Sequence, residues 1–370
     1  MTSDPYPVPS IGSPIDLTVR PPGSKSETIR ALAAAAMAPG RSHIYMPLRA
    51  DDPYAMVNGL GGLGVEVDTR GEPWSVDGSG GRLQAGSTID VNESGLSARI
   101  LVAMAGSAHG VTRIEGGGRL PERPMGGIVS VLRSQGVEVS AERLPIEVTG
   151  RGRLWGGQMT VDCSESSQFA TAAMLVAPTM EEPCILELTG LSGSAGYLDG
   201  TVSIMRRFGA EVVKTVTGYE IANSGYQPAD VVIEPDASAA VYPMAMAAIS
   251  RGRVVIDGLG TESWQPDLEV AKALESMGCV VEWHDNRTVV DARGVDLVGL
   301  RADMSEAPDG ALALAVVCLF ADTPSVLTGL GSLRVKESDR LSAIHAEISR
   351  IGGCAVVEDD GLSIEPAPLH

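Results

Sequence analysis

Five alanine-rich apolar segments recur along the chain at a nearly constant spacing, and this repeat strongly limits the possible folds. They begin at Ala31, Ile100, Phe169, Tyr242 and Ala311, so that successive starts are 69, 69, 73 and 69 residues apart. Each is followed by a short β-type run, then by an amphipathic segment that ends in Gly before another β-type run. A helix–strand–helix–strand unit repeated about every 70 residues excludes a single Rossmann domain and predicts an α/β protein of five similar units.

The two helices of each unit have different patterns. The first is apolar all round, which predicts that it is buried and that its N-terminus points to a surface shared by all units. The second has helical apolar spacing, as at Leu341, Ile344 and Ile348, and a Gly where a C′ cap is expected.

The first of the buried helices begins in the stretch PPGSKSETIR, residues 21–30. Ser24 followed by Glu27 predicts a capping box, and we expect the helix to run on to Gly40. Lys25 and Arg30 then lie on its first turns, where free N–H groups and the helix dipole favour an anion. The spacing is not that of a Walker A loop, and an ordinary capped surface helix explains this stretch equally well.

The other helix starts also carry polar residues. These are Gly95 and Arg99, then Ser166, Ser167 and Gln168, then Asp236 and Ser238, and finally Asp309. Polar clusters also occur near the second helices, and they contain Asp51, Asp52, Arg123, Lys336, Glu337 and Arg340. Any one start is explained by ordinary capping, and the run RVKESDR by a solvated, salt-bridged helix start. Together they predict a cleft in which helix dipoles and a few cations hold a polyanionic small molecule.

Composition narrows the classes of partner. The chain has 370 residues, a net charge of −19 and a hydrophobic fraction of 44%, which argues against nucleic acid or an anionic membrane as partner. Two of its four lysines, Lys25 and Lys336, lie inside the polar motifs. The five cysteines show no CxxC spacing and the five histidines are scattered, so we expect reduced thiols, a cytoplasmic location and no metal. We find no signal peptide and no apolar run long enough to cross a membrane.

The motifs GSKSxxxR, ESGxxxR, ERPMGG, SSQF, PDASAA, PDxA and RVKESDR occur in one order along the chain. In that order they resemble the EPSP synthases, the 3-phosphoshikimate 1-carboxyvinyltransferases, over essentially the whole chain. The resemblance implies an enolpyruvyl transferase fold, a two-domain inside-out α/β barrel of repeated βαβαββ units. It also implies a central domain of residues 23–234 and a discontinuous domain of residues 1–22 and 235–370.

The implied reaction transfers the enolpyruvyl group of phosphoenolpyruvate to the 5-hydroxyl of shikimate 3-phosphate and releases phosphate, in a monomer without cofactor or metal. The implied catalytic residues are Asp309, Glu337 and Lys25. Those implied to bind shikimate 3-phosphate are Lys25, Ser26, Arg30, Ser166, Ser167, Gln168, Ser194, Tyr197, Asp309, Ser332 and Lys336. Those implied to bind phosphoenolpyruvate are Lys25, Gly95, Arg123, Gln168 and Arg340.

The chain departs from the family pattern at Ile29, Glu93, Leu96 and Ser332. An added carboxylate at Glu93 is unfavourable beside an anion unless it points away or pairs, for example with Arg99. The repeat predicts a sixth unit from about residue 380, and the resemblance places an Asp-His-Arg motif and a last lysine there, so we interpret the chain as cut short. The alternatives are an enolpyruvyl transferase with another cyclitol-type acceptor, or a non-catalytic binding protein. A UDP-N-acetylglucosamine enolpyruvyl transferase is disfavoured, because no cysteine precedes Asp162.

Overall fold

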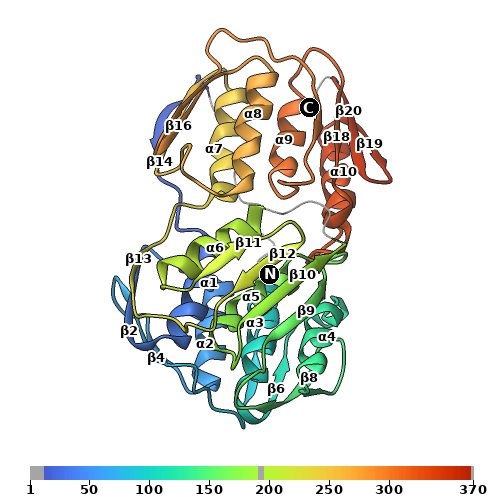
Figure 1. Cartoon of the computed structure of the whole chain (residues 1–370). Coiled ribbons are helices and arrows are strands. Elements are labelled where there is room, and N and C mark those ends of the chain that lie inside the picture. The colour runs from blue at the N-terminus through green and yellow to red at the C-terminus, as the bar shows by residue number, and fades with distance from the viewer. Residues whose placement is uncertain (1–11, 191–195, 368–370) are drawn as a thin grey trace.

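The chain forms two lobes, seen one above the other in Figure 1. The structure, a computed structural model, describes residues 12–190 and 196–367. One hydrophobic core is built from buried residues between Ile29 and Ile233, and the second from buried residues between Ala237 and Ile364. We call these the central lobe and the terminal lobe.

Each repeat unit contributes to a four-stranded sheet in which a parallel pair is extended by two antiparallel strands. In the central lobe the first sheet has the strand order β13 (Asp230–Val232), β2 (Pro39–Tyr45), β4 (Trp74–Ser79), β3 (Glu66–Asp68). The second has the order β5 (Thr88–Asp90), β6 (His109–Glu115), β8 (Ile146–Arg151), β7 (Glu138–Val139). The third has the order β11 (Val212–Lys214), β12 (Gly218–Ile221), β10 (Cys184–Thr189), β9 (Gly157–Asp162). In the terminal lobe the sheet orders are β1 (Asp16–Val19), β14 (Arg253–Asp257), β16 (Arg287–Asp291), β15 (Val280–His284); and β17 (Arg301–Asp303), β18 (Ser325–Thr328), β20 (Gly361–Glu365), β19 (Cys354–Glu358).

Two of these sheets begin with a strand from a distant part of the chain. β1 precedes the central lobe in sequence but pairs with β14 of the terminal lobe, with Leu17 opposite Val254. β13 follows the central lobe's other strands but pairs with β2, with Val231 opposite Ile44. The two lobes have therefore exchanged the strands that simple sequence order would have given them.

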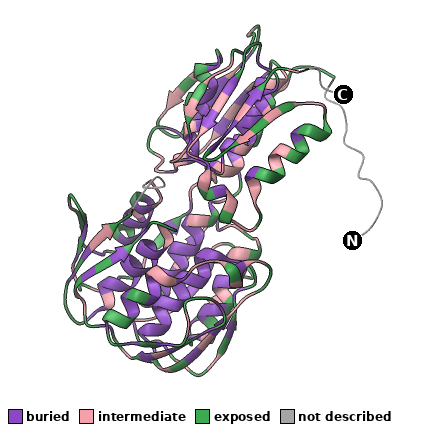
Figure 2. Cartoon of the chain, turned by 90° about the vertical axis from the view of Figure 1, so that its right-hand side faces the viewer, coloured by how far each residue is buried: buried purple, intermediate pink, exposed green. Residues whose placement is uncertain are grey.

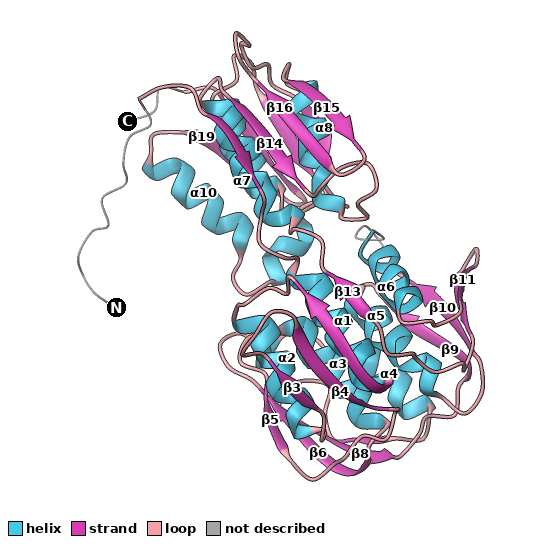
Figure 3. Ribbon diagram, turned by 90° about the vertical axis from the view of Figure 1, so that its left-hand side faces the viewer, coloured by secondary structure: helices cyan, strands magenta, loops and turns pink. Residues whose placement is uncertain are grey.

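The first helix of every unit lies inside its lobe. These helices are α1 (Lys25–Met37), α3 (Gly95–Gly106), α5 (Gln168–Val176), α7 (Ala237–Ile249) and α9 (Ala311–Cys318). In the central lobe the sheets lie on the outside and helices fill the interior, as Figures 2 and 3 show. All residues of α1 from Glu27 to Met37 are buried, as the apolar segment from Ala31 predicts, and the polar Glu27, Thr28 and Arg30 are buried with them.

The second helices are amphipathic and end as predicted. They are α2 (Asp51–Gly62), α4 (Gly126–Ser134), α6 (Gly196–Arg207), α8 (Glu269–Ser276) and α10 (Arg340–Arg350), and short 3-10 helices span Leu120–Glu122, Ala177–Thr179, Pro266–Leu268 and Gly331–Val335. The glycine after each second helix has a positive φ, from 75° at Gly136 to 108° at Gly278. Glycine adopts this conformation without the steric penalty that other residues incur, so the pattern marks the helix ends.

Two sequence-based details of α1 are wrong. The helix ends at Met37, not at Gly40, because Gly40 is already part of β2. The capping box is only half formed: the Ser24 hydroxyl accepts from the Glu27 N–H, but Glu27 does not return the bond. Its carboxylate instead binds the Arg207 guanidinium, 2.6 Å away, and the N–H of Glu234, 2.7 Å away.

The two chain segments that connect the lobes are bonded to each other. The N–H of Ser24 donates to the Glu234 carbonyl, and the N–H of Asp236 donates to the Pro22 carbonyl, both at 2.8 Å. The Asp236 carboxylate accepts from the Ala239 N–H at the start of α7 and from the Lys25 N–H at the start of α1. One side chain thus caps a helix in each lobe, and this fixes how the two helix starts face each other.

Candidate active site

A cleft of about 1160 Å³ lies between the lobes and is lined by residues of both. Every site residue predicted above that the structure describes lines this cleft; Ser194 lies outside the described residues. The cleft also contains Asp52, Arg99, Asp236 and Ser238 from the helix-start and polar motifs, whereas Asp51 is not among its lining residues.

The central lobe contributes the starts of its buried helices. Lys25 and Ser26 open α1, Gly95 opens α3 and Gln168 opens α5, preceded by Ser166 and Ser167. The first N–H groups of a helix have no partner within the helix, and the positive end of its dipole favours anions. Two of these groups are bonded to side chains, the Lys25 N–H to Asp236 and the Gln168 N–H to Ser166. The Lys25 ammonium lies 3.1 Å from Asp52 of α2, so this lysine is held toward the cleft by a partner on the neighbouring helix.

The terminal lobe contributes an ion-pair cluster around two carboxylates. The Arg340 guanidinium contacts Asp309 at 2.8 Å and Glu337 at 2.6 Å, and the Lys336 ammonium lies 3.5 Å from Asp309. Arg123 of the central lobe reaches Glu337 at 3.3 Å. Ser332 lies in the 3-10 helix just before this cluster. Four predicted charged residues thus meet in the terminal lobe, and the fifth, Arg123, comes from the opposite lobe.

The ionisation of Glu337 follows from these neighbours. Burial opposes its charged form, but a backbone hydrogen bond and the charges of Arg340, Arg123 and Lys25 outweigh burial and lower its pKa to about 2. The free cleft therefore holds Glu337 as a carboxylate at neutral pH.

Arg30 is buried and its charge is solvated by neutral oxygen atoms. Its guanidinium donates to the Thr201 hydroxyl at 2.8 Å, the Ser26 carbonyl at 3.0 Å and the Tyr197 carbonyl at 3.2 Å. Burial lowers the pKa of Arg30 to about 10, so the group remains cationic at neutral pH. Thr171 of α5 and Thr201 of α6, which hold it, were not predicted, because a single hydroxyl within a helix carries no recognisable pattern.

Arg99, named above in a helix start and as a possible partner of Glu93, holds the predicted residue Gln168. Its guanidinium donates to the Gln168 side-chain oxygen at 2.9 Å and to the Pro124 carbonyl at 3.0 Å, next to Arg123. With its oxygen engaged, the Gln168 amide keeps its NH₂ group for the cleft. Burial, and then the charge of Arg123, lower the pKa of Arg99 to about 9.

Two departures from the family motifs do not reach the cleft. Ile29 is fully buried in the core of the central lobe. Glu93 is exposed and lies over Gly118, where an added Cβ would be 2.4 Å from its carboxyl group; it does not pair with Arg99. Leu96, by contrast, lines the cleft.

The charge of the cleft differs from that of the whole chain. Eight cationic side chains line it against seven carboxylates, in a protein whose net charge is −19. Local gathering of cations lets an acidic protein bind an anion.

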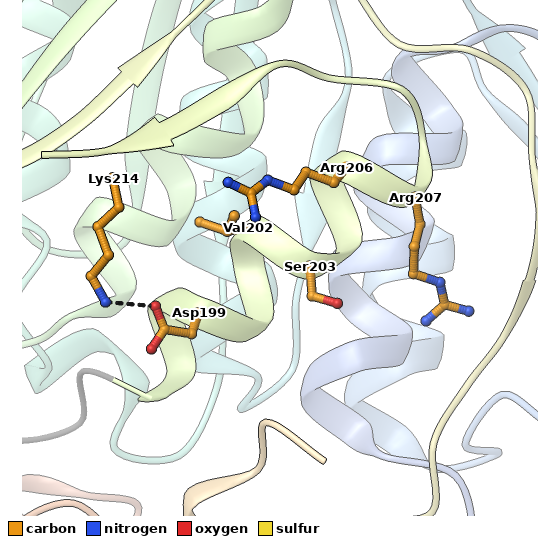
Figure 4. Close-up of a pocket in the computed structure, with 6 residues that line it drawn as sticks. All are labelled: Asp199, Val202, Ser203, Arg206, Arg207 and Lys214. Atoms are coloured by element: carbon orange, nitrogen blue, oxygen red, sulfur yellow. Dashed lines mark hydrogen bonds and ion pairs between the residues drawn. The ribbon is translucent and has the colours of Figure 1, made fainter. Parts of the chain in front are cut away.

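A second hollow, of about 480 Å³, lies on the outer side of α6 and is drawn in Figure 4. Its cations are already engaged: Lys214 pairs with Asp199 at 2.8 Å, Arg206 donates to the Val212 carbonyl, and Arg207 binds Glu27. In Figure 4 the Arg207 side chain points away from Lys214. The charged side chains of this hollow bind different partners and do not form one anion-binding group.

Among the described residues no group of three or more His, Cys, Asp and Glu side chains is placed to hold a metal ion. Within the same residues, no helix has the length and apolar character needed to cross a bilayer. The five cysteines are all free thiols, and four of them are buried.

Comparison with solved structures identifies the fold. A 2.37 Å structure of EPSP synthase from Acinetobacter baumannii superposes with a TM-score of 0.80 at 25% identity, covering 96% of this chain and 83% of that one. A second structure of EPSP synthase from that organism gives a TM-score of 0.78 at 23% identity. The repeated units, the two exchanged strands and the cleft between the lobes define a protein of the enolpyruvyl transferase fold.

Sequence comparison then gives the family. The profile of the EPSP synthases, described as 3-phosphoshikimate 1-carboxyvinyltransferase, matches residues 9–370. The 3-phosphoshikimate 1-carboxyvinyltransferase of Methanoregula boonei is 38% identical over 367 residues, which are 97% of this chain and 86% of the relative. That of Photobacterium profundum is 35% identical over 371 residues, covering 97% and 85%. The chain belongs to the EPSP synthase family.

Proposed function

We propose that the cleft transfers the enolpyruvyl group of phosphoenolpyruvate to the 5-hydroxyl of shikimate 3-phosphate, which yields 5-enolpyruvylshikimate 3-phosphate and phosphate. This is the reaction of the family, and it belongs to the route to chorismate and the aromatic amino acids. The catalytic residues are Asp309, Glu337 and Lys25.

The observation that carries this proposal is the meeting of Arg123 and Arg340 on one carboxylate. The two arginines come from opposite lobes, and both lie within 3.3 Å of Glu337. A phosphate or carboxylate group that took the place of Glu337 would touch both guanidinium groups, which suit such oxygens in a planar, two-pronged contact. Phosphoenolpyruvate offers both kinds of group. With Gly95 and Gln168 nearby in the cleft, this is where we place it.

The acceptor occupies the helix starts of the central lobe. That side is lined by Ser26, Arg30, Ser166, Ser167 and Tyr197. Helix N-termini and hydroxyl groups there suit a sugar-like ring with a phosphate. From the terminal lobe, Ser332, Lys336 and Asp309 face the same space, and Gln168 lies between the two substrates. Lys25 contributes a positive charge where both anions approach.

The chemistry needs one group that accepts a proton and one that supplies it. The acceptor hydroxyl must lose its proton as its oxygen attacks C2 of phosphoenolpyruvate, and C3 must gain one, which gives a tetrahedral ketal. Loss of phosphate from that ketal, with removal of a proton from C3, gives the product. Asp309 and Glu337 are the carboxylates for these transfers, each contributing on the order of 10²–10⁴-fold, and Lys25 stabilises the developing charge.

Substrate binding changes the role that Glu337 can take. Arg340 and Arg123 are among the groups that lower its pKa. When phosphoenolpyruvate draws these two charges to itself, the Glu337 pKa rises, and the carboxyl group can then both accept and return a proton.

We infer the identity of the acceptor from the departures from the family motifs that reach the cleft. Of the four departures, Ile29 and Glu93 are outside the cleft and Leu96 and Ser332 line it, and of these two only Leu96 brings in an apolar side chain. An apolar residue at one edge weakens a hydrogen bond but keeps the anion-binding groups in place, which supports shikimate 3-phosphate over another cyclitol.

The test is release of phosphate from phosphoenolpyruvate by this protein, with and without shikimate 3-phosphate. We expect release that requires the acceptor. Shikimate without its phosphate is the matched control, and turnover with it at an equal rate would indicate a different acceptor. No release from well-folded protein would favour the binding-protein alternative.

We further propose that the protein acts as a monomer in the cytoplasm. All site residues that the structure describes come from one chain, and five free thiols suit a reducing compartment. Light scattering at micromolar concentration that gave twice the chain's mass of 38.4 kDa would contradict the first part.

A further inference from the structure

The segment Ser263–Asp267, just before α8, belongs to the terminal lobe in sequence but packs against the central lobe. An added Cβ at Gly200 of α6 would lie 2.4 Å from the Trp264 indole, and the Trp264 ring stands edge-on to Tyr197, with centroids 6.3 Å apart. Gln265 accepts from the Ala237 N–H and donates to the Pro235 carbonyl in the second connecting segment. This segment is therefore a bridge between the lobes.

Asp267 at the end of this segment is 2% exposed and accepts three hydrogen bonds. One carboxylate oxygen accepts from the Gly310 N–H at 3.1 Å. The other accepts from the Ser238 hydroxyl at 2.5 Å and from the Tyr197 hydroxyl at 3.1 Å. Gly310 and Ser238 belong to the terminal lobe, whereas Tyr197 belongs to α6 of the central lobe.

Two of these three donors, Ser238 and Tyr197, line the cleft, and the third, Gly310, is buried. Gly310 directly follows Asp309 and precedes α9, so a fixed Gly310 peptide fixes the backbone that carries the catalytic carboxylate. The position has little room to move, because a Cβ at Gly310 would lie 2.7 Å from a methyl of Val270. On the other side of the cleft, the carbonyl of Tyr197 accepts from Arg30. One carboxylate thus connects the Asp309 backbone to the wall that holds Arg30.

A buried carboxylate is costly to keep. Burial, followed by the charges of Asp309 and Asp236, raises the Asp267 pKa, while the hydrogen bonds from Ser238 and Tyr197 oppose that rise. A core position next to two other carboxylates offers no electrostatic gain to stability. Because its hydrogen bonds reach residues of both lobes, Asp267 can instead hold these residues in place.

We propose that Asp267 is a positioning residue for the reaction proposed above, on which this inference rests. It holds Asp309 through the Gly310 peptide, and it sets the distance between that carboxylate and the central-lobe wall through the Tyr197 hydroxyl. Tyr197 accordingly acts through Asp267 more than through direct contact with the acceptor.

The test compares Asp267→Asn, Tyr197→Phe and the double variant with wild type, each by kcat and by KM for both substrates. Asn keeps the shape but can present only one acceptor oxygen, so one side of the connection is lost. We expect kcat to fall about 10- to 100-fold in Asp267→Asn, as for small misplacements of a reacting group, with both KM values nearly unchanged. Tyr197→Phe should lower kcat as well, and the double variant should be no slower than Asp267→Asn.

Tyr226→Phe is the matched control. The Tyr226 hydroxyl is also buried and donates at 2.8 Å to the Leu175 carbonyl, but it lies in the central core away from the cleft. We expect its kcat to equal that of wild type, although its thermal midpoint falls. Circular dichroism checks the fold of each variant; if Asp267→Asn does not fold, a lower kcat at constant KM in Tyr197→Phe still supports the proposal.

Results that would reject the positioning role can be distinguished from results that would reject the proposed function. A kcat within twofold of wild type in folded Asp267→Asn, or losses that multiply in the double variant, would reject the positioning role. A Tyr197→Phe variant with a raised KM for shikimate 3-phosphate and unchanged kcat would show that the hydroxyl binds the acceptor directly. Wild-type protein without acceptor-dependent turnover rejects the proposed function itself, before any variant is compared.

Discussion

The Nη1 atom of Arg123 lies 3.3 Å from Oε1 of Glu337, and the two residues come from opposite lobes of the chain. Glu337 also binds Arg340 of its own lobe at 2.6 Å. An internal carboxylate therefore occupies the two guanidinium groups that we assign to phosphoenolpyruvate. The free cleft keeps its cations paired, and an incoming anion must compete with Glu337 for them.

Substitution Glu337→Gln separates the two roles of this residue. We expect kcat to fall on the order of 10²–10⁴-fold, because a proton-transfer group is lost. Affinity for phosphoenolpyruvate should rise, because the competing charge is removed. Calorimetric titration and turnover measure the two effects. Glu347→Gln, in the helix α10 that follows Glu337 and paired with Arg350 at the surface, is the control; weaker binding with normal turnover in Glu337→Gln would contradict this assignment.

Arg123→Lys tests the geometry of the anion contact. Lysine keeps the charge but cannot make a two-pronged contact with phosphate or carboxylate. We expect KM for phosphoenolpyruvate to rise about tenfold, which corresponds to a loss of about 1.4 kcal/mol, while KM for shikimate 3-phosphate stays constant. The control is Arg133→Lys, whose guanidinium pairs with Glu142 on the surface. An equal rise in both KM values would instead indicate a general disturbance of the cleft.

Glu27 predicts a pH-dependent stability. Its side chain is 1% exposed, and burial, followed by the charge of Glu234, raises its pKa from 4.5 to about 7, although Arg207 opposes the shift. The folded state therefore holds this proton more tightly than the unfolded state does. The resulting stability is fully present below pH 4.5 and is lost as the pH rises to about 7, with a span of about 3 kcal/mol.

Urea unfolding between pH 5 and 8 measures this effect. The Glu27→Gln variant cannot ionise here, so the difference in unfolding free energy between wild type and variant should change steadily over that range and level off above it. Glu211→Gln, at an exposed position, is the matched control. A constant difference for Glu27→Gln would mean that the carboxyl group is ionised throughout.

Gly23 in the first connecting segment has no space for a side chain. An added Cβ would lie 2.1 Å from the Met46 carbonyl oxygen, a backbone atom that cannot rotate away. We expect Gly23→Ala to lower the unfolding free energy by about 2–4 kcal/mol. In Gly61→Ala, by contrast, the new methyl group meets nothing within 4 Å and lies in α2, so stability should rise by about 0.5–1 kcal/mol. Chemical denaturation measures the unfolding free energy of both variants. Equal changes in the two would contradict the close contact between residue 23 and the Met46 carbonyl.

The repeat made the fold largely predictable. All-apolar first helices, amphipathic second helices and their terminal glycines such as Gly136 follow from local periodicity and backbone conformation. The end of α1 was misplaced because Gly40 lies in a strand, and the alanine-rich run gives no local sign of where the helix stops. Which strands exchange between the lobes came from the family resemblance, since pairing between residues more than 180 positions apart leaves no periodic signal.

Part of the site was predictable for a similar reason. Lys25, Arg123 and Glu337 stand in polar motifs, and the structure brings them to one cleft. Asp267 was passed over, because a single aspartate before an amphipathic helix looks like an ordinary cap. Glu27 was assigned to the capping box, and only its three-dimensional neighbours show that it binds Arg207 instead.

The pairing of β1 with β14 has a consequence for the order of events on the ribosome. Residues 16–19 emerge first, but their partner, Arg253–Asp257, is made more than 230 residues later. At roughly 5–20 residues per second, β1 therefore remains without its partner strand for some tens of seconds. During this time the whole central lobe, including β13, is synthesised and can fold. The terminal lobe must then pair its strand β14 with β1, which is attached to a central lobe that has already folded. A pause in translation after β14 would give these two strands time to pair.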